Sequence, residues 1–202
     1  MSLDPRKLAP HDLALALLFA AFFAGVVAGP PRVDNDVFWH LAIGRQIAAH
    51  GFPRFDPFGF STDGIAWSPP EWLSELGMYG VHAVGGLWAL AALRVPLLVA
   101  LALLLGSRAR TLGASPPAAL LVLALASAPA SVHLPMRPLL IGHVLTAVVL
   151  DQLARQRVGQ KHAVALLPLL FVVWANVHPS WPVGLAFLAL ALVAGVALPR
   201  LG

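Results

Sequence analysis

Two carboxylates and an imidazole stand within the seven-residue stretch 34–40 (DNDVFWH), directly after the first hydrophobic segment of the chain. Asp34 and Asp36 can act as a general base and a metal ligand, or together as ligands of one divalent cation such as Mg²⁺ or Mn²⁺. The alternative is structural, with Asp36 capping a helix and Asp34 solvated. Acidic groups beside a membrane are costly unless they bind something, so this stretch is the first candidate site.

His40 follows Asp36 by one helical turn, so both side chains can face the same site. The imidazole can bind a phosphate or hydrogen-bond the carboxylate. An interfacial histidine with no such role is the alternative.

Two arginines are the candidate phosphate ligands. Arg94 interrupts a hydrophobic segment, where burial without a partner would cost several kcal/mol, so we expect either an ion pair or a lipid phosphate beside it. Arg137 lies in a short polar turn and can hold a phosphate with its guanidinium fork or contact a lipid headgroup.

Four more polar residues are candidate substrate-binding groups. Asn176 and His178 end a hydrophobic segment, where they line either a cavity or a solvated turn. Asp56 and Glu71 are the possible site members of the long polar interval that precedes the second span. Its other acids, Asp63 and Glu75, are interpreted as loop and cap residues.

The composition indicates an integral membrane protein. Of 202 residues, 59% are hydrophobic and 11% are charged, whereas soluble domains carry about 25% charged residues. The few basic residues do not form a face suited to nucleic acid. The chain has no cysteine, which excludes disulfides and thiolate chemistry.

The elements that must position these groups are six hydrophobic segments in a single transmembrane domain over 1–202, so the predicted fold is an all-α polytopic membrane protein. The expected spans are 13–29, 87–106, 118–132, 139–153, 163–177 and 182–198. A cleaved signal peptide is the alternative for the first, and the proline after the cut disfavours it.

The loop 30–86 is expected to hold two interfacial helices. The first runs from Val37, after an Asp36 cap, to His50, with Gly51 as the terminating residue. The second starts at Ser68-Pro69-Pro70-Glu71, a capping-box sequence, and stops at Gly85-Gly86.

The distribution of basic residues predicts a cytoplasmic N-terminus and a periplasmic 30–86 loop. Eight fall in the expected cytoplasmic segments: Arg6, Lys7, Arg108, Arg110, Arg155, Arg157, Lys161 and Arg200. Four fall outside: Arg32, Arg45, Arg54 and Arg137. The candidate site residues then converge on the periplasmic face.

The segments that contain these residues resemble a known protein family. The segments 34–45 (DNDVFWHLAIGR), 50–51, 56–58 (DPF) and 71–73 (EWL) look like the N-terminal part of a bacterial multispan family usually described as uncharacterised or glycosyltransferase-like, with a D-x-D-x-W-W-H-L-x-x-G opening. Arg137-Pro138 and Asn176-Val177-His178 fall where its later exposed turns fall. Phe38 replaces a tryptophan, and His178-Pro179-Ser180 replaces a commoner His-Gly pair.

This layout is similar to the GT-C class of membrane glycosyltransferases, in which Asp34 and Asp36 would be the acidic motif. The resemblance implies a bacterial inner-membrane enzyme that moves a sugar from a polyprenyl-phosphate donor to a glycan, lipid or protein acceptor, commonly with a divalent metal. Members of the class have more spans, so we expect a truncated module. A non-enzymatic subunit or transporter component of cell-envelope export is the alternative; the polar groups at one face favour the enzyme.

Overall fold

The structure, a computed structural model, describes residues 35–62, 64–111, 113–115, 118, 136–157 and 164–197. Its helices there are α2 (Asn35–His50), α3 (Trp72–Thr111), α5 (Pro138–Arg157), α6 (Leu167–Val177) and α7 (Trp181–Ala197). Within the same ranges the isolated bridge between Phe55 and Ala66 is the one β-type contact. The predicted all-α class is confirmed. The expected span 13–29 and nearly all of 118–132 lie outside the described residues.

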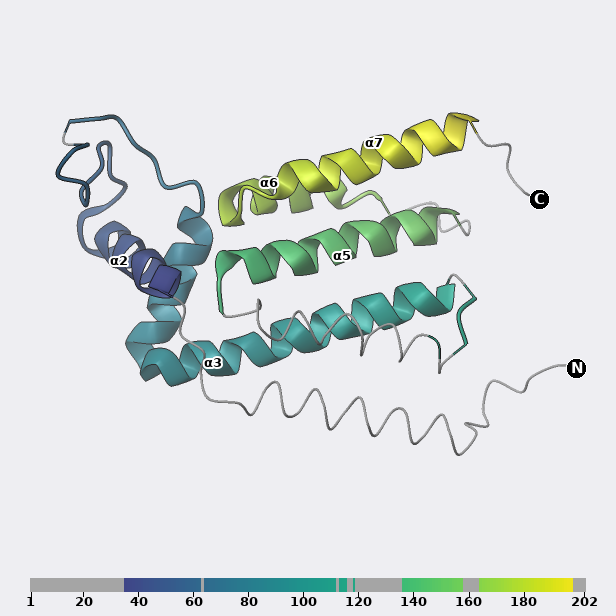
Figure 1. Cartoon of the computed structure of the whole chain (residues 1–202), viewed down its shortest axis with the longest axis horizontal. Coiled ribbons are helices and arrows are strands. Elements are labelled where there is room, and N and C mark those ends of the chain that lie inside the picture. The colour runs from purple at the N-terminus through teal and green to yellow at the C-terminus, as the bar shows by residue number, and fades with distance from the viewer. Residues whose placement is uncertain are drawn as a thin grey trace, which may run out of the picture.

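The long helix α3 consists of two segments joined by a sharp bend at two glycines. Gly85 (φ −145°, ψ 20°) and Gly86 (φ 61°, ψ −154°) leave the helical conformation, and the positive φ of Gly86 favours glycine. Figure 1 shows the first segment crossing one end of the molecule and the second running alongside α5. The predicted end of a helix at Gly85-Gly86 is therefore confirmed.

Two of the described helices, α3 and α5, are long and apolar enough to cross a membrane. At 1.5 Å per residue, the 20 residues of α5 extend about 30 Å, the thickness of a bilayer's hydrocarbon core. The 11 residues of α6 extend only about 16 Å. Expected spans 87–106 and 139–153 thus coincide with helices of spanning length. Helices α6 and α7 match the positions of the last two expected spans, but they are shorter than the 18 residues of a candidate span. The described residues do not show a set of six spans.

The starts of α2 and α3 differ from the sequence prediction. Helix α2 is already formed at Asn35, so Asp36 lies in its first turn rather than at the cap, where a carboxylate still interacts favourably with the helix dipole. Helix α3 begins at Trp72 rather than Pro69. The predicted capping box fails because the Glu71 carboxylate is turned toward two histidines.

The C-terminal end of α2 agrees with prediction. Gly51 adopts φ 80°, and its amide donates to the Ile47 carbonyl at 2.9 Å, which closes the helix in the usual left-handed cap.

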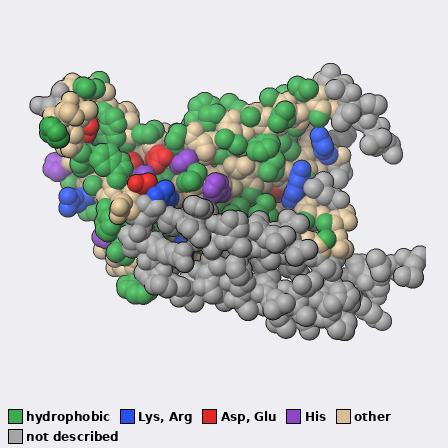
Figure 2. All heavy atoms as spheres, viewed as in Figure 1, with side chains coloured by type: hydrophobic (Ala, Val, Ile, Leu, Met, Phe, Trp, Pro, Cys, Tyr) green, Lys and Arg blue, Asp and Glu red, His purple; other side chains and the backbone are tan. Residues whose placement is uncertain are grey.

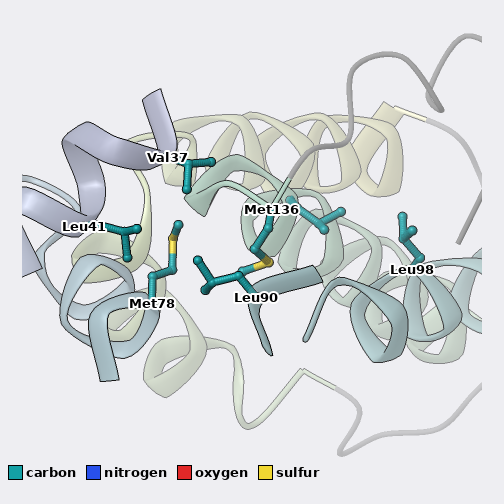
Figure 3. Packing of buried hydrophobic residues seen from close by; sticks show 7 residues of the cluster. Val37, Leu41, Met78, Leu90, Leu98 and Met136 are labelled. Atoms are coloured by element: carbon teal, nitrogen blue, oxygen red, sulfur yellow. The ribbon is translucent and has the colours of Figure 1, made fainter. Parts of the chain in front are cut away.

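A hydrophobic cluster fastens α2 to α3 and α5. Val37 and Leu41 of α2 face Met78 and Leu90 of α3, and Met136, which precedes α5, packs beside them (Figure 3). Burying side chains of this size contributes about 1.5–3 kcal/mol each. The cluster therefore fixes the face of α2 that points at α3, and this face includes His40.

Candidate functional site

Four separate segments meet at one end of the helices. They are α2, the start of α3, the turn before α5 and the turn between α6 and α7. Figure 1 shows the starts of α5 and α7 at the end that α2 crosses. In Figure 2, acidic and histidine side chains gather at this end of the visible face and basic side chains lie at both ends, while hydrophobic side chains cover much of α6 and α7.

His40 of α2 lies between two carboxylates of the α3 region. Its Nδ1 is 3.1 Å from Glu75 Oε1, a hydrogen bond, and 3.6 Å from Glu71 Oε2. Glu71 and Glu75 are one helical turn apart, so both carboxylates face α2. Glu75 is 2% exposed and is one of the largest fully buried side chains among the described residues.

His178 approaches the other carboxylate oxygen of Glu71. Its Nε2 is 3.4 Å from Glu71 Oε1, and its Nδ1 accepts a hydrogen bond from the Ser180 amide at 3.0 Å. That bond places the proton of the neutral imidazole on Nε2, facing the carboxylate. Ser180 is held in turn, since its hydroxyl accepts from Trp174 Nε1 at 3.1 Å. The predicted polar cluster after α6 therefore points inward.

Close backbone packing brings this turn to the site. A Cβ added at Gly142 of α5 would lie 2.6 Å from Ser180 Oγ and 3.4 Å from His178 Nδ1. Glycine at 142 thus lets the His178–Ser180 turn lie directly on α5.

Burial shifts the pKa values of Glu71 and His178. Burial raises the pKa of Glu71; His40 opposes this rise, while Glu75 and Asp36 add to it. Burial also lowers the pKa of His178, and the positive forms of His143 and His40 would lower it further. The site therefore favours a neutral His178 whose Nε2 faces the Glu71 carboxylate.

Asp36 forms a second polar pair beside this cluster. Its Oδ2 is 3.1 Å from a terminal nitrogen of Arg137. The Asp36 side chain is 60% exposed and that of Arg137 is 28% exposed, so the pair is reachable from outside. Two candidate site residues, Asp36 and Arg137, therefore lie side by side, while Asp34 lies outside the described residues.

The remaining predicted site residues have other surroundings. Asn176 accepts a hydrogen bond from Trp72 Nε1 at 2.7 Å, which ties α6 to α3. Asp56 is used within its own loop, where it accepts from Thr62 Oγ1 at 2.5 Å and from the Phe58 amide at 2.9 Å. Arg94 is buried on the second segment of α3, one turn from Leu90 and from Leu98.

Glu75 is the member that sequence reasoning missed. The available signal was its spacing of four from Glu71, which puts both side chains on one face of the predicted helix. From the sequence, Glu75 was interpreted as a loop or cap residue.

The candidate metal ligands in the structure also differ from the predicted pair, Asp34 and Asp36. Among the described residues, the group whose ligand atoms lie within 4.8 Å of one another is His40, Glu71 and Glu75, and it does not include Asp36.

Comparison with known proteins gives no assignment: no protein-family model, no curated protein and no solved structure matches this chain.

Proposed function

We propose that the protein is a multi-pass glycosyltransferase of the bacterial inner membrane, which transfers a sugar from a polyprenyl-phosphate donor to an acceptor hydroxyl or amine at the periplasmic face. The observation that carries the proposal is the placement of the site. Carboxylates, imidazoles and an arginine meet at one end of helices that are long and apolar enough to cross a membrane. A lipid-linked donor and a water-soluble acceptor meet at such a boundary.

The Asp36–Arg137 pair supplies both charges that this transfer needs. A donor phosphate can take the Arg137 guanidinium in place of Asp36, since arginine binds phosphate with a rigid fork. Asp36 then accepts the proton of the acceptor. The acceptor oxygen or nitrogen bonds to the anomeric carbon, the carbon–oxygen bond to phosphate breaks, and the polyprenyl phosphate leaves with the electron pair and is stabilised by Arg137.

The other groups would contact the substrates. His40 lies one turn from Asp36, and Glu71 is close enough to Asp36 for their charges to interact. Sugar hydroxyls placed between them would find both donors and acceptors. Arg94 and Asn176 remain candidates for the lipid and acceptor sides.

The proposed orientation follows the charge at the two ends of the helices. Arg108, Arg155 and Arg157 lie at the C-terminal ends of α3 and α5, away from the site. This supports a cytoplasmic location for that end. Because the chain has no cysteine, single cysteines at Ser61 and Ser115 can be labelled with an impermeant reagent. Periplasmic labelling at Ser61 alone is expected, and labelling at Ser115 alone would reverse the orientation.

The activity is tested with the full chain in liposomes that contain radiolabelled polyprenyl-phosphate sugars and a panel of acceptors. We expect transfer by the wild type and a loss of about 10²–10⁴-fold in Asp36→Asn, because the amide cannot accept a proton. The same change at Asp34 tests the other carboxylate of the sequence prediction. Asp56→Asn is the matched control and should keep its activity.

Full activity in both Asp34→Asn and Asp36→Asn would remove the proposed base. If the folded wild-type protein transferred no sugar from any donor, the enzymatic function would be wrong. The alternative, a non-enzymatic subunit of cell-envelope export, would then be favoured.

A further inference from the structure

The ligand atoms of His40, Glu71 and Glu75 have the spacing of a metal site. His40 Nδ1 lies 3.1 Å from Glu75 Oε1 and 3.6 Å from Glu71 Oε2. In a tetrahedral site with metal–ligand bonds of about 2.1 Å, neighbouring ligand atoms are about 3.4 Å apart. The two measured separations lie on either side of this value. The ligand atoms of all three side chains lie within 4.8 Å of one another, close enough for one ion to contact them together.

A buried carboxylate oxygen gives independent evidence for a ligand. Glu75 is 2% exposed, and its Oε1 is used by His40. Its Oε2 is buried and has no hydrogen-bond partner within the described part of the chain. Leaving such an oxygen unsatisfied costs about 1–3 kcal/mol, and more when the group is charged. A cation bound by both oxygens of Glu75 removes this cost.

The surroundings of Glu71 resemble the support that metal-binding carboxylates receive. His178 Nε2 lies 3.4 Å from Glu71 Oε1, and the Ser180 amide fixes the orientation of the His178 ring. Glu71 Oε2 is the oxygen directed at His40. Outer groups of this kind orient metal ligands and strengthen binding.

We propose that His40, Glu71 and Glu75 bind one divalent first-row transition-metal ion, of the Zn²⁺ or Mn²⁺ kind, with His178 positioning Glu71. One imidazole nitrogen and two carboxylates suit these ions, whereas Mg²⁺ and Ca²⁺ prefer oxygen ligands alone. Three protein ligands leave a further position for water or a substrate oxygen. The proposal rests on these contacts and does not depend on the proposed sugar transfer.

The test is metal binding by the full chain in detergent, purified without a polyhistidine tag and stripped with a chelator. Co²⁺ serves as the probe, with bound metal counted by mass spectrometry and the site observed by visible absorption. We expect one equivalent per chain in the wild type and in the control Asp56→Asn. His40→Ala and Glu75→Gln should bind at least tenfold more weakly. Binding by both variants equal to that of the wild type would overturn the site.

Two conservative changes keep the test decisive if those variants unfold. His178→Phe should weaken Co²⁺ binding by about 10–100-fold, the usual effect of removing an outer partner. Glu71→Asp retains a carboxylate and should bind Co²⁺ with an altered spectrum. An unchanged affinity and spectrum in both variants would contradict the proposal. Displacement of Co²⁺ by equimolar Mg²⁺ would overturn the choice of metal.

Discussion

Gly44 of α2 lies directly against the backbone of Glu75 in α3. A Cβ added at Gly44 would collide with the Glu75 carbonyl oxygen and would lie 2.7 Å from Tyr79 Cβ. His40 is one turn before Gly44, and Glu71 is one turn before Glu75. The point at which the two helices touch therefore determines how close His40 comes to both carboxylates.

Gly44→Ala should separate these helices and weaken the His40 contacts. The obstructing atoms belong to backbone and to a Cβ, which cannot rotate away, so we expect a loss of about 1–3 kcal/mol in the free energy of unfolding. Denaturant unfolding in micelles measures it.

Gly77→Ala is the matched control for that change. It lies in the same segment of α3, and an added Cβ there meets nothing within 4 Å. Alanine has the better helix propensity, so this variant should be as stable as the wild type or more stable by up to about 1 kcal/mol. If Gly44→Ala behaved like Gly77→Ala, the close crossing of α2 and α3 would be wrong.

Trp72→Phe tests the connection between α3 and α6. It removes the 2.7 Å hydrogen bond from Trp72 Nε1 to Asn176 Oδ1 while keeping an aromatic ring. The loss should be about 0.5–1.5 kcal/mol in thermal or denaturant unfolding. Trp88→Phe is the control, because the Trp88 side chain is 74% exposed and should tolerate the change. Equal stability of the two variants would show that the bond contributes nothing.

The loop around Asp56 should lose order in acid. Hydrogen bonds from the Thr62 side chain and the Phe58 amide lower the pKa of Asp56 below its ordinary value of 3.8. A lowered pKa in the folded state means that the stabilisation is present above the unfolded pKa and is lost as the pH falls through the folded pKa. Amide hydrogen exchange at Phe58 and Gly59, corrected for intrinsic rates, should therefore accelerate below about pH 4. Asp56→Asn should abolish this pH dependence, and a wild-type loop insensitive to acid would contradict it.

Local signals in the sequence were sufficient for much of the fold. The glycines at 51 and 85–86 marked helix boundaries that the structure has, because Gly51 and Gly86 adopt a positive φ, which favours glycine. Helix starts were less predictable. The Ser68–Glu71 pattern satisfies a local capping rule, but tertiary contacts of Glu71 with His40 and His178 prevail over it.

Several residues of the polar cluster were predictable from the sequence, but its full membership was not. A polar stretch after a hydrophobic segment identified Asp36 and His40, and the exposed turns identified Arg137 and His178. The presence of Glu75 at the site depends on the crossing of α2 and α3, which is set by Gly44 and by the packing of Val37 and Leu41. Such a contact between residues 35 positions apart leaves no periodic mark in one sequence.

The Asp36–Arg137 pair should matter little for stability. Because the Asp36 side chain is 60% exposed, water screens the pair, and a double-mutant cycle with Asp36→Asn and Arg137→Gln should give a coupling of about 0–1 kcal/mol.

The Asp151–Arg155 pair is the comparison, since Asp151 is 4% exposed at the other end of α5 and its Oδ2 lies 2.6 Å from Arg155 Nε. Asp151→Asn should cost more than Asp36→Asn in denaturant unfolding, because burial strengthens the charged hydrogen bond. This order would mean that loss of transfer in Asp36→Asn reports chemistry rather than unfolding. The reverse order would show that Asp36 is a structural residue, and the role of proton acceptor would have to move to another carboxylate.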